Sequence, residues 1–289
     1  MALLRPDGSD AISPTAHYTG YVWARNGLSP PGLATTEGRL LFESLRVPMV
    51  VSGALGGGTL EAYLLARHRA IDALLERAIA ERRATQVIEV AAGLSGRGLR
   101  FARRHGEAVR YIEADLPAMA ARKRRTLARL GASSEHHQVR DLDALTDSGP
   151  QSLAELAAEL DHRRGLAIIT EGLLGYLEPS DVRALWRRFA DTLRDFRHGT
   201  YISDIHIGEE RNLRVRAFRL LLSAFVRGRV HLHFGNEPEV LAALTAAGFS
   251  SARVHRAYRV TMDGGESGRA GDDSDPAARL AHILEASTG

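Results

Sequence analysis

The chain has 289 residues and a formal net charge of +3, with 44% hydrophobic and 25% charged residues. These values are typical of an ordinary soluble globular protein that can bury a large core without disulfides or a structural metal. The chain has no cysteine, which excludes a disulfide framework, a thiolate metal site and a catalytic thiol. We find no signal-like start and no uncharged stretch of membrane-spanning length, so we expect a cytoplasmic protein without membrane contact.

The N-terminal part is rich in aromatic and turn-forming residues between residues 13 and 48. We interpret residues 1–58 as a cap, irregular or helical, ahead of a main domain at 59–289. Residues 60–82 carry apolar side chains at helical spacing, which predicts a helix that packs on a sheet: Ile71, Leu74, Leu75, Ala78 and Ile79.

From Thr85 onward, strand and helix patterns alternate. Strands are predicted at 85–91, 109–114, 136–139, 167–170 and 200–205, and helices at 99–105, 117–130, 152–160 and 180–195. Strict alternation predicts an α/β fold with a doubly wound, mostly parallel, Rossmann-like sheet. Ligands bind such sheets at the carboxyl ends of the strands, near the topological switch point.

After Asp204 the alternation stops. A long helix rich in arginine and leucine is predicted at 209–227, and because the sheet does not need it we interpret 207–235 as an inserted helical lid. A further helix at 237–247 should end at Gly248, followed by a strand at 252–260, a Gly- and Asp-rich loop at 263–276 and an antiparallel last strand at 280–286. The whole sheet would then have seven strands.

The most informative motif is the small-residue turn that follows the strand at 85–91. A second strand ends on Asp115, about twenty residues later, which is the spacing typical of a nucleotide-cofactor crevice. Gly93 would let a cofactor approach the backbone closely. The carboxylate of Asp115 could accept two hydrogen bonds from a ribose diol, or it could cap the helix that begins at Pro117.

Acidic residues recur at the ends of the next two strands, at Asp141 and Glu171. An acid that ends an apolar, buried strand is unusual unless it has a partner. The four strand ends combine into one pattern: Ala91-Ala92-Gly93-Leu94 leading into Arg97, Asp115-Leu116-Pro117 followed by Arg122-Lys123, Asp141-Leu142, and Thr170-Glu171-Gly172-Leu173-Leu174-x-Tyr176-Leu177.

In this combination, over roughly residues 67–260, the chain resembles the leucine carboxyl methyltransferase family. These are class I S-adenosylmethionine (SAM) enzymes, and the family includes tetracenomycin-type polyketide O-methyltransferases. The resemblance implies SAM as the cofactor and S-adenosylhomocysteine (SAH) as its product. It implies this set of cofactor-binding residues: Arg67, Glu89, Ala91, Gly93, Asp115, Asp141, Leu142 and Glu171.

Several of these residues have an implied role. Arg67 matches the family's arginine for the methionine carboxylate of the cofactor if one gap is allowed, and Arg69 remains an alternative. Asp141 and Leu142 would lie beside the adenine, and Glu171 near the positive end of SAM. Ala91 stands where the family has its first glycine, which suggests a slightly shifted turn.

The predicted function is SAM-dependent O-methylation of a small molecule, either a carboxylate or a polyketide or phenolic hydroxyl. A carboxylate needs no base, whereas a phenol benefits from one, and no catalytic residue is assigned. The alternatives are an RNA-modifying or RNA-binding relative and a catalytically idle scaffold of the same fold.

The acceptor is expected to contact a set of aromatic and basic residues: His17, Tyr18, Tyr21, Trp23, Tyr176, Arg211 and Arg214. Alternatively, the aromatic segment only packs the N-terminus onto the domain.

A basic run and a pair of histidines are interpreted without a binding role. The basic run at residues 122–125 is interpreted as a solvated helix face, so we expect no nucleic-acid partner. His231 and His233 share one face of a strand, but no carboxylate or cysteine pattern accompanies them, so we expect no metal. The expected partner is the small-molecule acceptor, and the expected state is a monomer or a homodimer.

Overall fold

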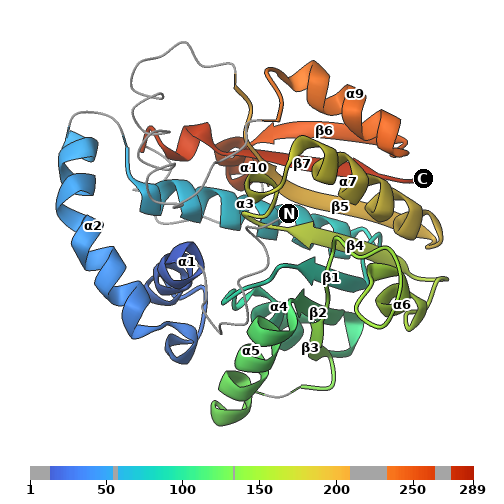
Figure 1. Ribbon diagram of the computed structural model, residues 1–289, viewed down its shortest axis with the longest axis horizontal. Coiled ribbons are helices and arrows are strands. Elements are labelled where there is room, and N and C mark those ends of the chain that lie inside the picture. The colour runs from blue at the N-terminus through green and yellow to red at the C-terminus, as the bar shows by residue number, and fades with distance from the viewer. Residues whose placement is uncertain (1–13, 55–57, 133, 209–232, 264–274) are drawn as a thin grey trace.

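The computed structural model describes residues 14–54, 58–132, 134–208, 233–263 and 275–289. They form one seven-stranded sheet with the order β3-β2-β1-β4-β5-β7-β6, covered by helices on both faces (Figure 1). In that order the strands are His137–Asp141, Arg110–Asp115, Gln86–Val90, Gly165–Thr170, His198–Ile205, His282–Ser287 and Ser251–Arg256. Strands β1 to β5 pair in parallel, and β7 is antiparallel to β5 and β6. The predicted doubly wound sheet and its antiparallel last strand are confirmed.

The two central strands, β1 and β4, have the burial that is typical of a parallel sheet. Every residue of β1 and β4 is buried, because helices cover both faces, and such strands read as nearly continuous apolar runs. Their carboxyl ends lie side by side, with Val90 opposite Thr170. The switch point of the sheet lies between these two strands, because β2 and β3 extend the sheet on one side and β5 on the other.

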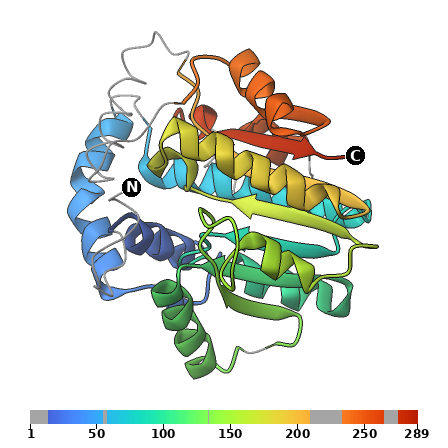
Figure 2. The same cartoon turned by 45° about the vertical axis from the view of Figure 1, so that its right-hand side comes forward.

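The helices divide between the two faces of the sheet. One face packs on α3 (Leu60–Ala80), α4 (Arg97–His105), α5 (Pro117–Arg129) and α10 (Ala257–Asp263). The other face packs on α6 (Leu153–Ala158), α7 (Pro179–Arg194) and α9 (Glu237–Ala247). Figure 2 shows α7 in front of the sheet and α3 behind it.

The N-terminal cap is helical and consists of α1 (Pro14–Arg25) and α2 (Thr36–Ala54), drawn in blue in both views. Helix α1 buries Tyr18, Val22 and Trp23. A Cβ atom added to Gly20 would lie only 2.9 Å from Cβ of Leu94, so the backbone of α1 packs directly on the turn that follows β1. The division of the chain at residue 58 stays a prediction.

One boundary was predicted incorrectly. The strand expected at 252–260 ends at Arg256, and the chain continues as α10. Ala257 and Val260, three residues apart, are both buried and belong to the same core cluster as α3. A helix brings side chains at this spacing to one face, whereas a strand would turn them to opposite faces.

The lid helix predicted at 209–227 lies outside the described residues, as does most of the loop at 263–276. The ends of the predicted insertion are described and meet each other. Ile207 forms a bridge with Phe234, and the backbone N–H of Gly208 donates to the carbonyl of Phe234 at 3.0 Å. The insertion therefore starts and finishes beside the carboxyl end of β5.

Candidate active site

The turn after β1 has two residues in the left-handed backbone region. Gly93 has a φ of +50° and Ala91 a φ of +55°. Glycine adopts this conformation without strain, whereas alanine does so at a cost of about 1–2 kcal/mol. A Cβ atom added to Gly93 would meet no atom of the described residues within 4 Å, so the backbone here borders open space within that part of the structure.

Asp115 holds this turn from the end of β2. Its Oδ2 accepts the backbone N–H of Gly93 at 2.7 Å, and its Oδ1 accepts the N–H of Leu116 at 2.8 Å. Helix α5 begins after Leu116 without a side-chain cap, so Asp115 is not the helix cap that the sequence left possible. Burial raises the pKa of Asp115, and the two backbone N–H groups counteract part of that rise.

The end of β3 lies beside Asp115. Asp115 and Asp141 are register partners, and the N–H of Leu142 donates to the carbonyl of Asp115 at 2.8 Å. Leu142 is buried, whereas Asp141 is partly exposed and accepts a hydrogen bond from Arg124 at 2.7 Å. Three of the predicted cofactor residues thus come together at one edge of the sheet with Gly93.

Arg67 joins the ends of β4 and β5. Its Nε donates to Oε1 of Glu171 at 3.0 Å, and its Nη1 donates to Oδ2 of Asp204 at 3.1 Å. The other oxygen of Asp204 accepts the N–H of Gly172 at 2.7 Å. Gly172 has a φ of +69°, and a Cβ atom there would lie 3.0 Å from Nη2 of Arg67, so only glycine leaves the guanidinium uncovered on that side.

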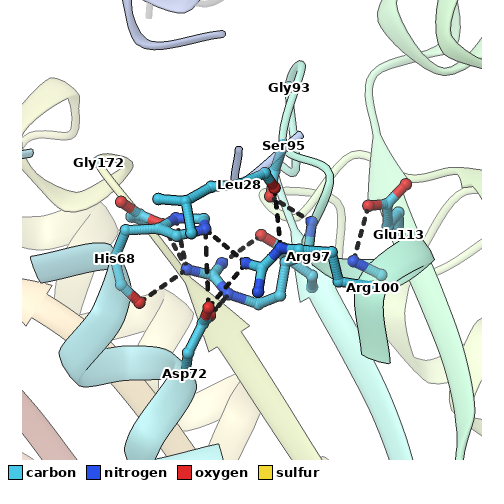
Figure 3. Close-up of polar contacts among 12 residues, drawn as sticks. Leu28, His68, Asp72, Gly93, Ser95, Arg97, Arg100, Glu113 and Gly172 are labelled. Atoms are coloured by element: carbon cyan, nitrogen blue, oxygen red, sulfur yellow. Dashed lines mark hydrogen bonds and ion pairs between the residues drawn. The ribbon is translucent and has the colours of Figure 1, made fainter. Parts of the chain in front are cut away.

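Arg97, at the first turn of α4, is fully buried at 0% exposure and binds three carboxylates. It donates to Asp72 at 2.5 Å, to Glu89 at 2.5 Å and to Glu171 at 2.6 Å. Figure 3 shows its guanidinium between α3 and the neighbouring strand ends. Glu89 also accepts the hydroxyl of Tyr111 at 2.7 Å. The carboxylates of Glu89 and Glu171 thus lie in a buried ion network.

His68 completes this network. Its Nδ1 lies 2.8 Å from Oε2 of Glu171, and its Nε2 lies 2.8 Å from Nη2 of Arg100. The ring packs on Trp23 of α1, with 5.0 Å between centroids. Burial, followed by the charge of Arg97, lowers the pKa of His68, so the imidazole is neutral near pH 7.

The network keeps its acids ionised. Burial opposes the charge on Glu171, but His68, Arg97 and Arg67 outweigh it and hold its pKa well below the ordinary value. Burial is likewise outweighed at Asp72, where Arg100, His68 and Arg97 lower the pKa to about 2. Buried charges paired in this way are costly to separate, because removal of one partner leaves the other uncompensated.

A second buried cluster was not predicted. Nζ of Lys123 lies 2.9 Å from Glu113, and Nε2 of His137 lies 3.0 Å from the same carboxylate. Lys123 belongs to the basic run interpreted as a solvated face, and for this residue that interpretation was wrong. Its spacing from Ala120 and Leu127, both buried, places it on the inner face of α5, a signal that the sequence did contain.

The residues predicted to contact the acceptor are only partly brought together. Tyr18 and Trp23 are buried in the core, and Tyr18 and Tyr21 pack against Phe42. His17 is partly exposed and bonds to Thr35 through Nδ1 at 2.7 Å. Tyr176 lies partly exposed in the 3-10 helix Leu174–Tyr176 after β4. Arg211, Arg214 and His231 lie outside the described residues, as does the rest of the predicted lid helix.

Sequence reasoning did not assign a role to Asp72, Asp204 or His206. Each becomes visible only when helix α3 is placed against the strand ends, because its partners are distant in sequence. Arg69, the alternative to Arg67, is partly exposed, and because it follows Arg67 by two residues in α3 it lies on a different side of the helix. His233, outside any metal cluster among the described residues, bonds through Nε2 to the carbonyl of Leu177 at 2.7 Å.

The comparisons with known proteins agree with this geometry. Residues 52–190 match the family model described as leucine carboxyl methyltransferase. This segment, just under half of the chain, is similar to the leucine carboxyl methyltransferase family. The matched segment contains the turn at Gly93, Asp115, Asp141, Arg67, Arg97 and Glu171. No curated protein matches the chain.

Solved structures share the fold of this leucine carboxyl methyltransferase relative. A Thermobifida fusca protein solved as a candidate methyltransferase has a TM-score of 0.61 and 14% identity, with 95% of this chain and 97% of that chain covered. The SAM-dependent methyltransferase SibL has a TM-score of 0.52 and 15% identity over 92% of this chain and 61% of SibL. A Nostoc punctiforme protein solved as a candidate O-methyltransferase has a TM-score of 0.50 and 13% identity, with coverage of 93% and 72%.

At these identities the similarity establishes the fold. The chain spans between 53% and 61% of the length of two longer structures that it matches. The family model that the chain matches and the solved structures that share its fold are those of methyltransferases. Among the described residues, no helix is both long and apolar enough to cross a membrane.

Proposed function

We propose that the chain transfers the methyl group of SAM to an oxygen of a small molecule, either a carboxylate or a phenolic hydroxyl of polyketide type. The matched family is named for the methylation of a carboxyl group, and the Nostoc punctiforme relative was solved as a candidate O-methyltransferase. The observation that carries the proposal is the contact between Asp115 and Gly93 at the carboxyl edge of the sheet.

The residues at this edge fit the cofactor. Open space over Gly93 leaves room for a ligand close to the backbone. The oxygens of Asp115 each accept one backbone N–H, and because a carboxylate oxygen can accept more than one hydrogen bond, both could also accept the ribose hydroxyls. Asp141 and Leu142, beside Asp115, would contact the adenine.

The methionine end of the cofactor fits the side of the switch point where β4 and β5 end, opposite Asp115. Arg67 is the residue that would bind the methionine carboxylate, since glycine at position 172 leaves one side of its guanidinium uncovered and an arginine pairs with a carboxylate through two parallel hydrogen bonds. Glu171 and Asp204 hold Arg67 in place. We therefore assign Glu171 to positioning rather than to direct contact with the cofactor.

When bound, SAM supplies a methyl group on a positively charged sulfur. The chain's own contribution is to orient this group and the acceptor and to exclude water. The buried ion network of Arg97 fixes α3 and α4 and the ends of β1 and β4 relative to one another, so the binding groups are held in place before ligand arrives. Helix α1 covers the network through Trp23 and His68.

Two features favour a small molecule over a nucleic acid as acceptor. Lys123 is buried against Glu113, and Arg124 pairs with Asp141, so half of the basic run at 122–125 is already compensated. Nucleic-acid binders usually present a concentrated, uncompensated basic surface. A monomer or homodimer in the cytoplasm remains our expectation for the assembly and the compartment.

The test combines binding with turnover. Calorimetry with SAH should show binding by the wild type, and a methyl-transfer screen of carboxylic acids and phenols with SAM should yield a product heavier by one methylene. The product's mass and its sensitivity to ester hydrolysis distinguish a methyl ester from a methyl ether. Binding of SAH without transfer to any oxygen acceptor would overturn the proposal, as would transfer to nitrogen or to RNA.

A further inference from the structure

A tyrosine and a histidine meet at the carboxyl end of β5. The hydroxyl of Tyr63 lies 2.9 Å from Nε2 of His206, and the two rings lie 6.0 Å apart between centroids. Tyr63 is buried in α3, whereas His206, directly after β5, is partly exposed. The contact therefore holds an imidazole in a fixed position that a ligand can reach.

The sheet topology places this pair on the acceptor side of the crevice. Asp115 and Asp141 end strands on one side of the switch point, and the proposed function puts the adenosine of the cofactor there. His206 ends β5, on the other side of the switch point. Tyr63 lies one helical turn before Arg67 on α3, the residue assigned to the methionine carboxylate. An acceptor that approaches the methyl group of the cofactor from the side of the sheet where β5 ends would meet His206.

Tyr63 from α3 and His282 from β7 face His206, and Asp204, two residues before His206, pairs with Arg67. The charge of Arg67 is balanced by Glu171 and Asp204. Burial, followed by the charge of Arg256, lowers the pKa of His282 to about 4, so this neighbour is neutral near pH 7. Arg67 is therefore compensated by its partners, and Arg256, the register partner of His282, is a second cation on this edge of the sheet.

We propose that His206 is the general base of the methyl transfer and that Tyr63 positions it. In the proposed tautomer, Nε2–H donates to the oxygen of Tyr63, and Nδ1 accepts the proton of an acceptor hydroxyl. The acceptor oxygen forms a bond to the methyl carbon, the bond from that carbon to sulfur breaks, and its electron pair stays on the sulfur, which becomes neutral. The proton on Nδ1 then leaves to solvent, so atoms and charges balance.

This inference rests on the proposed function and narrows it. A carboxylate is already ionised near neutral pH and has no proton to lose, whereas a phenol, with an ordinary pKa near 10, is activated by a base. A general base beside the acceptor therefore speeds methyl transfer only when the acceptor is a hydroxyl group that must lose its proton. The acceptor is therefore a phenol or a comparable hydroxyl compound rather than a carboxylic acid.

The experiment uses two probes with the same ring, 2-naphthol and 2-naphthoate, and three variants of the full chain. His206→Gln removes the base, Tyr63→Phe removes only the positioning hydroxyl, and His162→Gln is the matched control, because His162 is exposed in the loop before β4 at the opposite edge of the sheet. For each protein, kcat/KM is measured from about pH 5.5 to 9, together with the Kd for SAH and the thermal midpoint.

We expect transfer to 2-naphthol, with kcat/KM rising with pH and reaching a plateau in the range where histidines titrate. His206→Gln should lower kcat/KM about 100-fold or more and abolish this plateau. Tyr63→Phe should lower kcat/KM less and shift the pH at which the plateau begins. The Kd for SAH and the thermal midpoint should stay near wild-type values in His206→Gln, and His162→Gln should behave as wild type.

Several outcomes would overturn the assignment of His206. For His206→Gln, these outcomes are a kcat/KM equal to that of the wild type, or a loss of SAH affinity as large as the loss of kcat/KM. For the wild type, they are a kcat/KM that keeps rising with pH toward the pKa of the phenol, or methyl transfer to 2-naphthoate alone. The last result would leave the proposed function standing and remove only the base. No transfer to either probe, or to any oxygen acceptor in the wider screen, would overturn both.

Discussion

Arg97 and Glu171 lie 2.6 Å apart in the core, and this ion pair joins the first turn of α4 to the end of β4. Both residues belong to motifs that point to cofactor binding in the sequence. Their side chains instead bind each other and a set of neighbours, namely Arg67, His68, Asp72 and Glu89. The network joins α3 and α4 to β1 and to the end of β4, so we expect its main effect on the position of these elements.

The first prediction concerns Glu171→Gln. Loss of this carboxylate charge leaves Arg67 and Arg97 without a shared partner, so the free energy of unfolding should fall by about 3 kcal/mol, measured by urea denaturation. The control is Asp147→Asn, because Asp147 is 82% exposed in its pair with Arg188 and should change stability by less than about 0.5 kcal/mol. A variant of wild-type stability with weakened SAH binding would show that Glu171 serves the cofactor directly.

The second prediction concerns Asp115→Asn. The amide keeps the shape of the side chain but loses the charge and one acceptor, so the Kd for SAH should rise about tenfold, equivalent to about 1.4 kcal/mol. Calorimetry on folded protein measures this change. Asp141→Asn should have a smaller effect, because Asp141 is partly exposed and already paired with Arg124. Unchanged affinity in Asp115→Asn would contradict the ribose assignment.

The third prediction concerns the strained turn. Ala91→Gly should raise the free energy of unfolding by about 0.5 kcal/mol, since relief of the left-handed alanine outweighs the greater freedom of glycine in the unfolded chain. The same substitution at Ala114, fully buried in β2, should lower it by about 1 kcal/mol. If both changes destabilise the protein equally in urea denaturation, the turn is not strained.

The fourth prediction concerns acid stability. The pKa of His68 is lowered, that of Glu171 lies well below its ordinary value, and those of Asp72 and Glu113 are about 2. Below each group's ordinary pKa, the unfolded chain therefore binds more protons than the folded chain, and stability falls as pH falls. The decline should begin below about pH 6.5 through His68 and steepen below about pH 4.5 through the carboxylates.

Urea midpoints over this pH range measure the effect. In His68→Asn the decline between about pH 6.5 and 5 should be shallower, while the steep decline at lower pH should remain. Stability that rises as the pH falls from about 7 to 5 would mean that His68 is charged in the folded protein, contrary to the direction of its pKa.

The fifth prediction concerns Trp23, which the sequence left as either a wall of the acceptor pocket or a packing residue. Because Trp23 is 6% exposed and packs on His68, Trp23→Ala should lower the free energy of unfolding by about 3–5 kcal/mol. Leu40→Ala is the control, since Leu40 is 66% exposed and should change little. Normal stability with lost turnover in Trp23→Ala would restore the pocket assignment.

The strands of the sheet and the helices that cover it could be predicted because the sequence patterns that specify them are local. The apolar runs of β1 and β4 and the helical spacing of α3 each lie within a few turns of chain, and the alternation of the two patterns leaves few topologies. Helix α10 was missed because a short apolar segment fits either period. The burial of Lys123 was missed because a run of four basic residues dominates its local pattern.

By itself, the sequence determined the order of the elements, the parallel sheet and the edge where the strand-end acids gather, because these depend on periodicity and on short spacings along the chain. Only the tertiary structure decided which of these acids form buried ion pairs and which do not. Asp115 and Glu171 look alike in sequence, each ending a strand. Helix α3 brings Arg67 and His68 against Glu171, with Arg97 from α4, and the two arginine charges and the hydrogen bond to His68 outweigh its burial. Among the described residues, Asp115 instead accepts hydrogen bonds from backbone N–H groups.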